Sequence, residues 1–339
     1  MDGISQAMIV NYGLYNVLRT YCPPRDVSQI VQMNGQAFGL DPAQVRRAFE
    51  RAAAGGDAAV LQREVERRMF ERLDYIRCRP HRVLDSGCGV GHGLKLLRRR
   101  YPEADLFGMD FAPGVLSEAK RGESLFERAR RLVSGSRRFH VCADFARLPL
   151  RAAGVDMVWS NLALAWAGDP LAALREVHRV LTPGGLLMFS SYGPDTLKEL
   201  KTAFGAGSAA RHVHSFIDMH DLGDMLVASG FAAPVMDMEV ITLTYSEVRA
   251  LLRDLKASGA TCATRDRQRG LMGRRTWERM LASYERERKD GRVPATVEVI
   301  YGHAWKGEQR TTVDGRRIIE VELAAKKSRP FVRPEPTKT

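Results

Sequence analysis

The chain has 339 residues, of which 45% are hydrophobic and 27% are charged, and it carries a formal net charge of +12. This is an ordinary globular composition, and the length allows one large α/β core or two modest ones. No run of eighteen apolar residues occurs, the first residues lack the features of a signal peptide, and five scattered cysteines form no C-x-x-C pair. These observations argue against a membrane-spanning or secreted protein, a disulfide framework and a zinc site, so a cytoplasmic location is expected.

Residues 1–45 are expected to be an N-terminal extension without chemistry of its own. Asp41 can cap a helix and Pro42 suits its first turn, so a helix is predicted to begin there and to continue through Phe49. A second helix is predicted over residues 58–76, because apolar residues recur on one face among dense arginines and glutamates.

The run from Asp85 to Gly91 follows a short apolar segment and precedes an amphipathic one, which predicts a strand, a glycine-rich turn and a helix. Glycines at 87, 89 and 91 let the backbone approach a ligand where a Cβ would clash, and the helix offers its positive N-terminus. The G-x-G-x-G spacing departs from the G-x-G-x-x-G dinucleotide fingerprint. It resembles instead the first motif of S-adenosylmethionine (SAM) methyltransferases, whose positively charged cofactor suits an acid at Asp85. A turn that serves only strand-to-helix packing is the alternative.

Two further predicted strands close on an acid. Residues 105–110 end in Asp110, twenty-five positions after Asp85, where such folds place the carboxylate that accepts both ribose hydroxyls. A helix is predicted to start at 111–113 and to run to residue 120. Residues 137–144 end in Asp144, which can accept a hydrogen bond from the adenine amino group, with Phe145 against the ring.

The later elements complete an alternation of strands and helices. The strand at 155–162 brings Asn161 to its carboxyl end, where open α/β sheets bind ligands. A helix over 171–181 is predicted to stop at the 182–185 turn and to lead into a strand at 186–190. Further strands are predicted at 235–244 and 296–305, the last antiparallel to its neighbours as in the methyltransferase fold.

The expected fold class is α/β, with a doubly wound, mostly parallel, seven-stranded Rossmann-like methyltransferase sheet, a helical lid and N-terminal helices. The SAM-binding core with its leading helices is expected at 46–193, and the last strands with the helical substrate lid at 194–305. The tail at 306–339 is rich in proline and lysine and is predicted to be disordered.

From about residue 46 to residue 305 the chain resembles the malonyl-acyl-carrier-protein O-methyltransferases of biotin synthesis. The segments that carry this resemblance are 47–53, 61–64, 159–166, 193–200 and 252–256. The resemblance implies methyl transfer from SAM to the free carboxylate of malonyl on the carrier protein. The ester would mask the charge while the chain is elongated toward pimeloyl.

The cofactor site is expected to comprise residues of the glycine loop, of the strand ends and of one leading helix. These are Asp85, Gly87, Cys88, Gly89, Gly91, Asp110, Phe111, Asp144, Phe145, Asn161, Leu162 and Gln62. The sequence departs from the family pattern at Gly56, where a tyrosine is usual, and at Ser215, where the family has an arginine. Both departures predict an altered environment for the reacting carboxylate.

A carboxylate with a pKa of about 4 is already anionic at neutral pH, so its attack on a sulfonium methyl needs no general base. The site needs in-line placement, exclusion of water and a group that orients the carboxylate. Arg253, Lys256 and His214 are the candidates for that group. No metal is expected, because no carboxylate or cysteine completes a site around His212 and His214.

The net charge permits nucleic acid, an anionic membrane or an acidic protein as partner. The resemblance favours an acidic acyl carrier protein that carries malonyl, with malonyl-coenzyme A as the alternative substrate, and neither nucleic acid nor a membrane. Arg267, Arg269, Arg274 and Arg275 are predicted to form a basic rim that steers the carrier. Two other functions remain open: methylation of another acceptor, such as RNA, tRNA or a quinone precursor, and a SAM-binding interaction module with little or no catalysis.

Overall fold

The predicted alternation builds one mixed sheet in the computed structural model, which describes residues 39–54, 59–122, 136–205 and 210–307. Within these ranges seven strands have the order β3-β2-β1-β4-β5-β7-β6. Their bounds are β1 Arg82–Ser86, β2 Asp105–Asp110, β3 Arg138–Cys142, β4 Val155–Ser160, β5 Leu181–Tyr192, β6 Phe231–Tyr245 and β7 Val293–Lys306. The first five strands are parallel, and β7 runs antiparallel to both β5 and β6. The predicted fold class is confirmed, including the antiparallel last strand.

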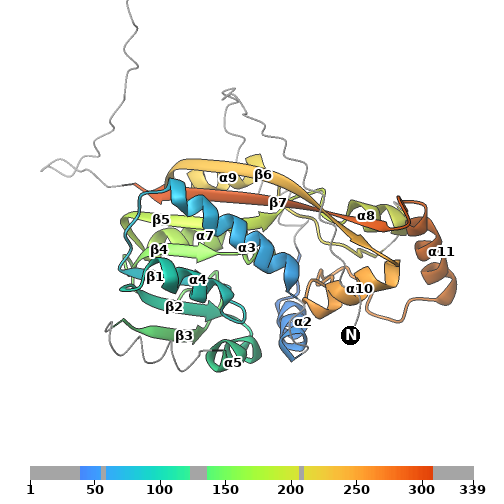
Figure 1. Ribbon diagram of the computed structural model, residues 1–339, viewed down its shortest axis with the longest axis horizontal. Helices are drawn as coiled ribbons and strands as arrows, with labels where there is room; N and C mark the ends of the chain where they lie inside the picture. The colour runs from blue at the N-terminus through green and yellow to red at the C-terminus, as the bar shows by residue number, and fades with distance from the viewer. Residues whose placement is uncertain (1–38, 55–58, 123–135, 206–209, 308–339) are drawn as a thin grey trace, which may run out of the picture. The chain divides into compact units, whose positions relative to one another are not determined.

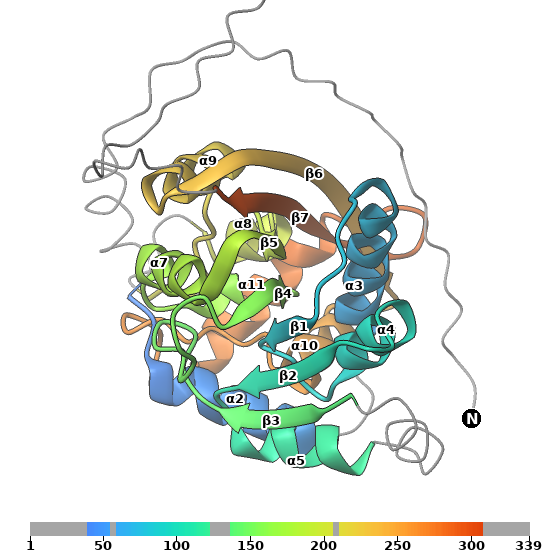
Figure 2. The same ribbon diagram turned by 90° about the vertical axis from the view of Figure 1, so that its left-hand side faces the viewer.

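Helices cover both faces of the sheet (Figure 2). On one face lie α7 (Pro170–Val180) and α9 (Met219–Ala228), whose apolar side chains join a core cluster with β4 and β5. On the other lie α3 (Val60–Arg72), α4 (His92–Arg100) and α5 (Pro113–Arg121), which pack in a second cluster. The central strands β1 and β4 are buried on both faces, and each contains a short apolar run, 83–84 in β1 and 157–159 in β4.

A separate group of helices lies in the part of the chain where the lid is predicted. The helices α8 (Lys198–Phe204), α10 (Val248–Ala257) and α11 (Arg274–Glu285) gather at the end of the long strands β6 and β7 (Figure 1). They share a third apolar cluster built around Leu200, Leu251, Met280 and Tyr284. The N-terminal helix α2 (Pro42–Ala54) contacts both α5 and α10, so it joins the lid to the sheet.

Several boundaries differ from the predicted ones. β3 ends at Cys142, so Asp144 lies in the following turn. β5 begins at Leu181 rather than 186, because residues 182–185 are accommodated as an irregularity in the pairing with β4 instead of ending the element. β6 begins at Phe231 and has an irregularity between Ala232 and Val235. The second helix is shorter than predicted and closes in a 3-10 turn, Leu73–Tyr75; another 3-10 turn spans Leu164–Trp166.

Candidate active site

The carboxyl ends of the parallel strands surround a cavity of about 480 Å³. It lies where the order of the sheet changes direction, between β1 and β4, which is where open α/β sheets bind ligands. Most of the predicted cofactor residues line it: Gln62, Gly87, Cys88, Gly89, Asp110, Phe111, Asp144, Phe145, Asn161 and Leu162. Asp85 and Gly91 are not in its wall. Glu66, His92 and Trp166, which sequence reasoning missed, are.

The glycine loop is held by backbone hydrogen bonds to the end of β2. The N–H groups of Gly87 and Cys88 donate to the carbonyl oxygen of Met109 at 2.7 and 2.9 Å. Gly89 has a φ of +53°, and a Cβ placed on it would meet nothing within 4 Å. Because Gly89 also lines the cavity, the absence of a side chain leaves room for a ligand close to the backbone.

Asp110 connects this loop to the start of the next helix. Its Oδ2 accepts from the Gly89 N–H at 3.1 Å and its Oδ1 from the Ala112 N–H at 3.0 Å. Burial raises the pKa of Asp110, and these backbone hydrogen bonds oppose the rise. Each carboxylate oxygen can accept a second hydrogen bond, so Asp110 can hold the loop and still receive hydroxyl groups from a ligand in the cavity.

Two more carboxylates lie together beside the cavity. Glu66 Oε2 lies 2.7 Å from His92 Nδ1, and Glu66 Oε1 accepts from Trp159 Nε1 at 3.1 Å. Asp85 lies behind the lining residues, and its Oδ2 is buried without a hydrogen bond among the described residues. Gly93 makes room for both acids, since a Cβ there would lie 2.2 Å from Glu66 Oε1 and 2.9 Å from Asp85 Oδ2. The pair gives this end of the cavity a negative environment that suits a cation.

Asn161 positions the wall through both ends of its side-chain amide. Its Nδ2 donates to the carbonyl oxygen of Gln62 at 2.9 Å, and its Oδ1 accepts from Ser190 Oγ at 2.8 Å. These bonds tie α3 to the ends of β4 and β5. The Gln62 side chain itself has a buried Oε1 without a hydrogen-bond partner in the described chain, which leaves it available to a ligand.

A second cavity, of about 210 Å³, adjoins the first under the lid helices. The two share Gln62, Trp166, Tyr192, Ser258 and Ala260. The second cavity is mostly apolar, and among the described residues no lysine or arginine lines it. The side chains between a ligand in this cavity and a ligand in the first cavity are therefore uncharged.

The residues predicted to bind the substrate carboxylate do not all lie at the cavities. His214 lines the second cavity, whereas Arg253 and Lys256 line neither cavity. Arg253 is 72% exposed and forms an ion pair with Glu247 at 2.9 Å. The apolar residues of α10, such as Leu251, face the lid core, so the basic residues lie on the opposite, exposed face. The geometry gives no support to the predicted role of Arg253 and Lys256.

Other residues singled out in the sequence have different surroundings from those predicted, or lie outside the described ranges. Arg267 is not a free member of the basic rim: its side chain is 15% exposed and pairs with Asp41 at 3.1 Å. Ser215 Oγ accepts a hydrogen bond from Arg211. Gly56 and the tail beyond 307 lie outside the described residues.

Two kinds of feature do not occur in the described ranges of the chain. No group of three or more histidine, cysteine, aspartate or glutamate residues suited to a metal ion occurs there. No helix in that part of the chain is long and apolar enough to cross a membrane.

Comparison with known proteins agrees with this geometry. The family described as methyltransferase domain matches residues 84–189. A malonyl-[acyl-carrier protein] O-methyltransferase of Laribacter hongkongensis (strain HLHK9) is 55% identical over 289 residues, which are 84% of this chain and 97% of that protein. Its namesake in Gallionella capsiferriformans (strain ES-2) is 52% identical over 290 residues, 85% of this chain and 99% of that protein. With such identity over nearly the whole length of its relatives, the chain belongs to the malonyl-[acyl-carrier protein] O-methyltransferase family.

Proposed function

We propose that this protein transfers the methyl group of SAM to the free carboxylate of a malonyl group on an acyl carrier protein. The observation that carries the proposal is the pair of adjoining cavities, one built from the glycine loop and strand-end acids and the other mostly apolar. The methyl ester would remove the charge of the malonyl carboxylate, as chain elongation toward pimeloyl in biotin synthesis requires.

The residues of the larger cavity fit SAM. Gly89 leaves space for a ligand against the backbone, and Asp110 offers carboxylate oxygens to the two ribose hydroxyls. Glu66 lines this cavity, and the nearby Asp85, whose pKa is raised by burial and by the charges of Glu66 and Asp110, would be stabilised as an anion by a positively charged ligand. Asp144 and Phe145 line the same cavity from the β3 side, where we place the adenine. Bound SAM supplies an electrophilic methyl group on a positively charged sulfur.

The chain itself contributes placement and exclusion of water. The acceptor is already an anion, so no side chain has to remove a proton. Trp166 and Tyr192 stand in the wall common to both cavities and keep the reacting groups within a mostly apolar enclosure. Binding one reactant in each cavity brings the carboxylate oxygen and the methyl carbon together, which converts an encounter of two molecules into a step within one complex.

We further propose that the carrier docks on a basic surface formed by Arg265, Arg269, Arg274, Arg275 and Arg279. All five are exposed, and the fully exposed Leu271 lies among them in sequence. The segment 265–279 contains six arginines and only two acidic residues. It follows directly on residues 260–262, which line the smaller cavity, so a carrier held there has a short path to the acceptor site.

The test is methyl transfer from SAM to malonyl-acyl carrier protein, with acetyl-acyl carrier protein and malonyl-coenzyme A assayed in parallel. We expect the malonyl carrier to gain a methyl ester, detected by mass spectrometry, and the acetyl carrier to gain none. SAM binding by calorimetry without transfer to either malonyl thioester would contradict the proposal and favour a binding module or another acceptor.

A further inference from the structure

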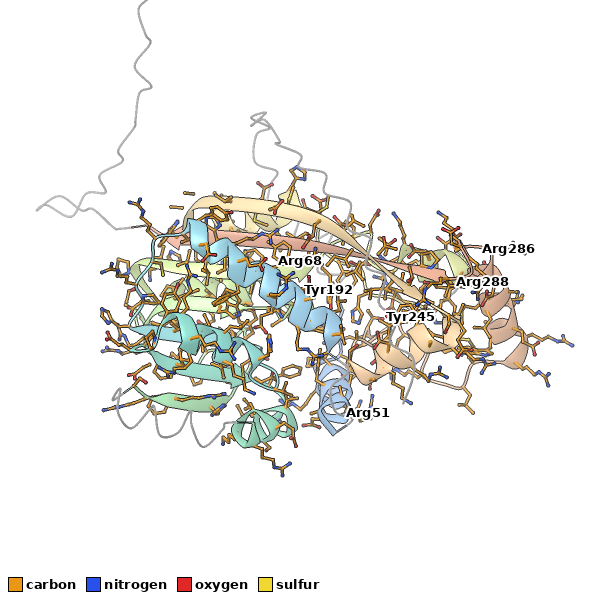
Figure 3. The ribbon with its side chains drawn as sticks, viewed as in Figure 1. Arg51, Arg68, Tyr192, Tyr245, Arg286 and Arg288 are labelled. Atoms are coloured by element: carbon orange, nitrogen blue, oxygen red, sulfur yellow. The ribbon has the colours of Figure 1, made fainter. Side chains whose placement is uncertain are left out.

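The wall between the two cavities contains a hydroxyl group that the described chain does not use. Tyr192 is the last residue of β5, at the carboxyl end where the sheet faces its ligands, and it lies beside α3 (Figure 3). Its ring packs on Phe216, with 5.3 Å between ring centroids. The residue is 5% exposed, and burial raises the pKa of its hydroxyl with no hydrogen bond from the described residues contributing. Because Tyr192 lines both cavities, this hydroxyl is available at their junction.

His214 offers a second unused donor on the same aromatic cluster. Its Nε2 lies 3.1 Å from the Ala263 N–H and 3.2 Å from the carbonyl oxygen of Thr261. A main-chain N–H can only donate, so we assign Nε2 as its acceptor and place the ring proton on Nδ1; the other tautomer would donate to Thr261 and leave the Ala263 N–H without this acceptor. No described group bonds Nδ1, and the ring packs against Phe216 and lines the smaller cavity. Burial lowers the pKa of His214, so the ring is neutral.

The charges around the smaller cavity favour the Tyr192 end for an anion. Asp254 is the charged residue that lines it in the described chain, and it accepts from the Tyr245 hydroxyl at 2.6 Å. Lys201 and Arg211 lie outside the lining, and their positive charges help to lower the pKa of His214. Tyr245 lies beside α10, away from Tyr192 beside α3 (Figure 3). A carboxylate ligand is repelled by Asp254, so it favours the part of the cavity where Tyr192 lies, away from that residue.

We propose that the Tyr192 hydroxyl and the His214 Nδ1–H bind the carboxylate of the acceptor, and that this chain orients its substrate with neutral donors instead of a lysine or an arginine. The inference rests on the proposed function and names the residues of its acceptor site. It replaces the role that the sequence suggested for Arg253 and Lys256.

Neutral donors suit the reaction for a physical reason. A carboxylate oxygen gives its electron pair to the methyl carbon while the carbon–sulfur bond breaks toward sulfur, so a negative and a positive charge disappear and no proton moves. Charge is therefore smaller in the transition state than in the bound reactants. A lysine or arginine would stabilise the reactant carboxylate more than the transition state, and so would slow the step. Hydrogen bonds from neutral groups in an apolar cavity orient the anion with less of this cost.

The first test uses Tyr192→Phe. Binding of malonyl-coenzyme A and of acetyl-coenzyme A is measured by calorimetry with S-adenosylhomocysteine present. We expect the preference for malonyl over acetyl to fall about 10- to 100-fold, since a hydrogen bond to a charged group is lost. Affinity for S-adenosylhomocysteine is measured in the same variant, and a fall in it as large as the fall in malonyl preference would assign the hydroxyl to the cofactor instead. Tyr101→Phe is the control for loss of a buried tyrosine hydroxyl, because Tyr101 lines neither cavity.

The second test separates the two nitrogens of His214. His214→Gln places an acceptor near the Nε2 position for the Ala263 N–H and loses the cavity donor, so it should keep its melting temperature and lose the malonyl preference. His214→Asn keeps a donor near Nδ1 but loses the acceptor for the Ala263 N–H, so it should keep the malonyl preference and have a lower melting temperature. If both Tyr192→Phe and His214→Gln keep the full preference for malonyl over acetyl, this inference is wrong, but the proposed function is unaffected. A wild-type protein that neither prefers nor methylates malonyl thioesters would overturn the proposed function as well.

Discussion

The carboxyl groups of Glu66 and Asp85 are buried close together, but they differ in their hydrogen bonds. Glu66 is bonded to His92 and Trp159, whereas Asp85 Oδ2 has no hydrogen bond within the described residues. Burial, followed by the negative charges of Glu66 and Asp110, raises the pKa of Asp85 well above its usual value, and Arg138 opposes the rise. In the absence of a positively charged ligand, an ionised Asp85 therefore costs stability.

This cost gives a prediction for Asp85→Asn without cofactor. A carboxyl group whose pKa is raised on folding binds its proton more tightly in the folded state, so the wild type gains stability relative to the variant as the pH falls. We expect the free energy of unfolding of Asp85→Asn, minus that of the wild type, to be larger at pH 8 than at pH 5. Each unit by which folding raises the pKa contributes about 1.4 kcal/mol. Urea unfolding at the two pH values measures the difference; equal differences would show that Asp85 does not titrate differently in the folded state.

At the level of elements, the sequence predicted well where local pattern and tertiary environment agree. The strands ending near Asp85 and Asp110 are buried on both faces, and their apolar runs are visible in the sequence. Proline and glycine at 182–185 predict a break, because these residues usually end an element, but pairing with β4 overrides that preference. The end of the same strand differs for another reason: the local pattern predicts an end at 190, whereas pairing with the distant β7 extends β5 to Tyr192.

Side-chain direction on the lid helix was the other limit of prediction. The spacing of Arg253 and Lys256 places them on a common side of α10, but spacing alone does not say which side faces the cavity. That depends on packing of Val248 and Leu251 against the lid core, which involves residues distant in sequence. The same holds for Glu66, which is one of many charged residues on α3 and is distinguished only by its burial.

The glycine loop allows a controlled prediction about cofactor binding. Gly89 and Gly184 both have a positive φ, of +53° and +74°, and a Cβ on either would meet nothing within 4 Å. Alanine at either position costs about 1–2 kcal/mol of backbone strain, but only Gly89 lines the cofactor cavity. We expect Gly89→Ala to weaken SAM binding at least about tenfold in calorimetry, whereas Gly184→Ala should bind normally. Equal affinity in both variants would remove the loop from the cofactor site.

Across the whole molecule, the basic residues behind the net charge of +12 have different roles. Many arginines are held in internal pairs, such as Arg68 with Glu64 and Glu239, and these join α3 to β6. Arg269 and Arg275 are exposed without a carboxylate partner among the described residues. Exposed, unpaired charges act at long range on an approaching partner, so this surface is where net charge should affect association.

The last prediction compares two sets of exposed arginines with the same total charge. Arg269, Arg274 and Arg275 belong to the proposed docking surface; Arg77, Arg79 and Arg151 lie before the amino ends of β1 and β4, at the opposite end of the sheet from the cavities. Changing the first set to glutamine should raise KM for malonyl-acyl carrier protein several-fold at low salt and flatten its salt dependence. The second set should leave KM close to the wild-type value.

Malonyl-pantetheine, which lacks the acidic protein, should be used equally by both variants, because screened long-range attraction does not act on a small thioester once it is bound. If both sets raise KM alike, net charge alone draws the carrier to the enzyme; if the first set impairs malonyl-pantetheine equally, these arginines support the lid and the docking proposal fails.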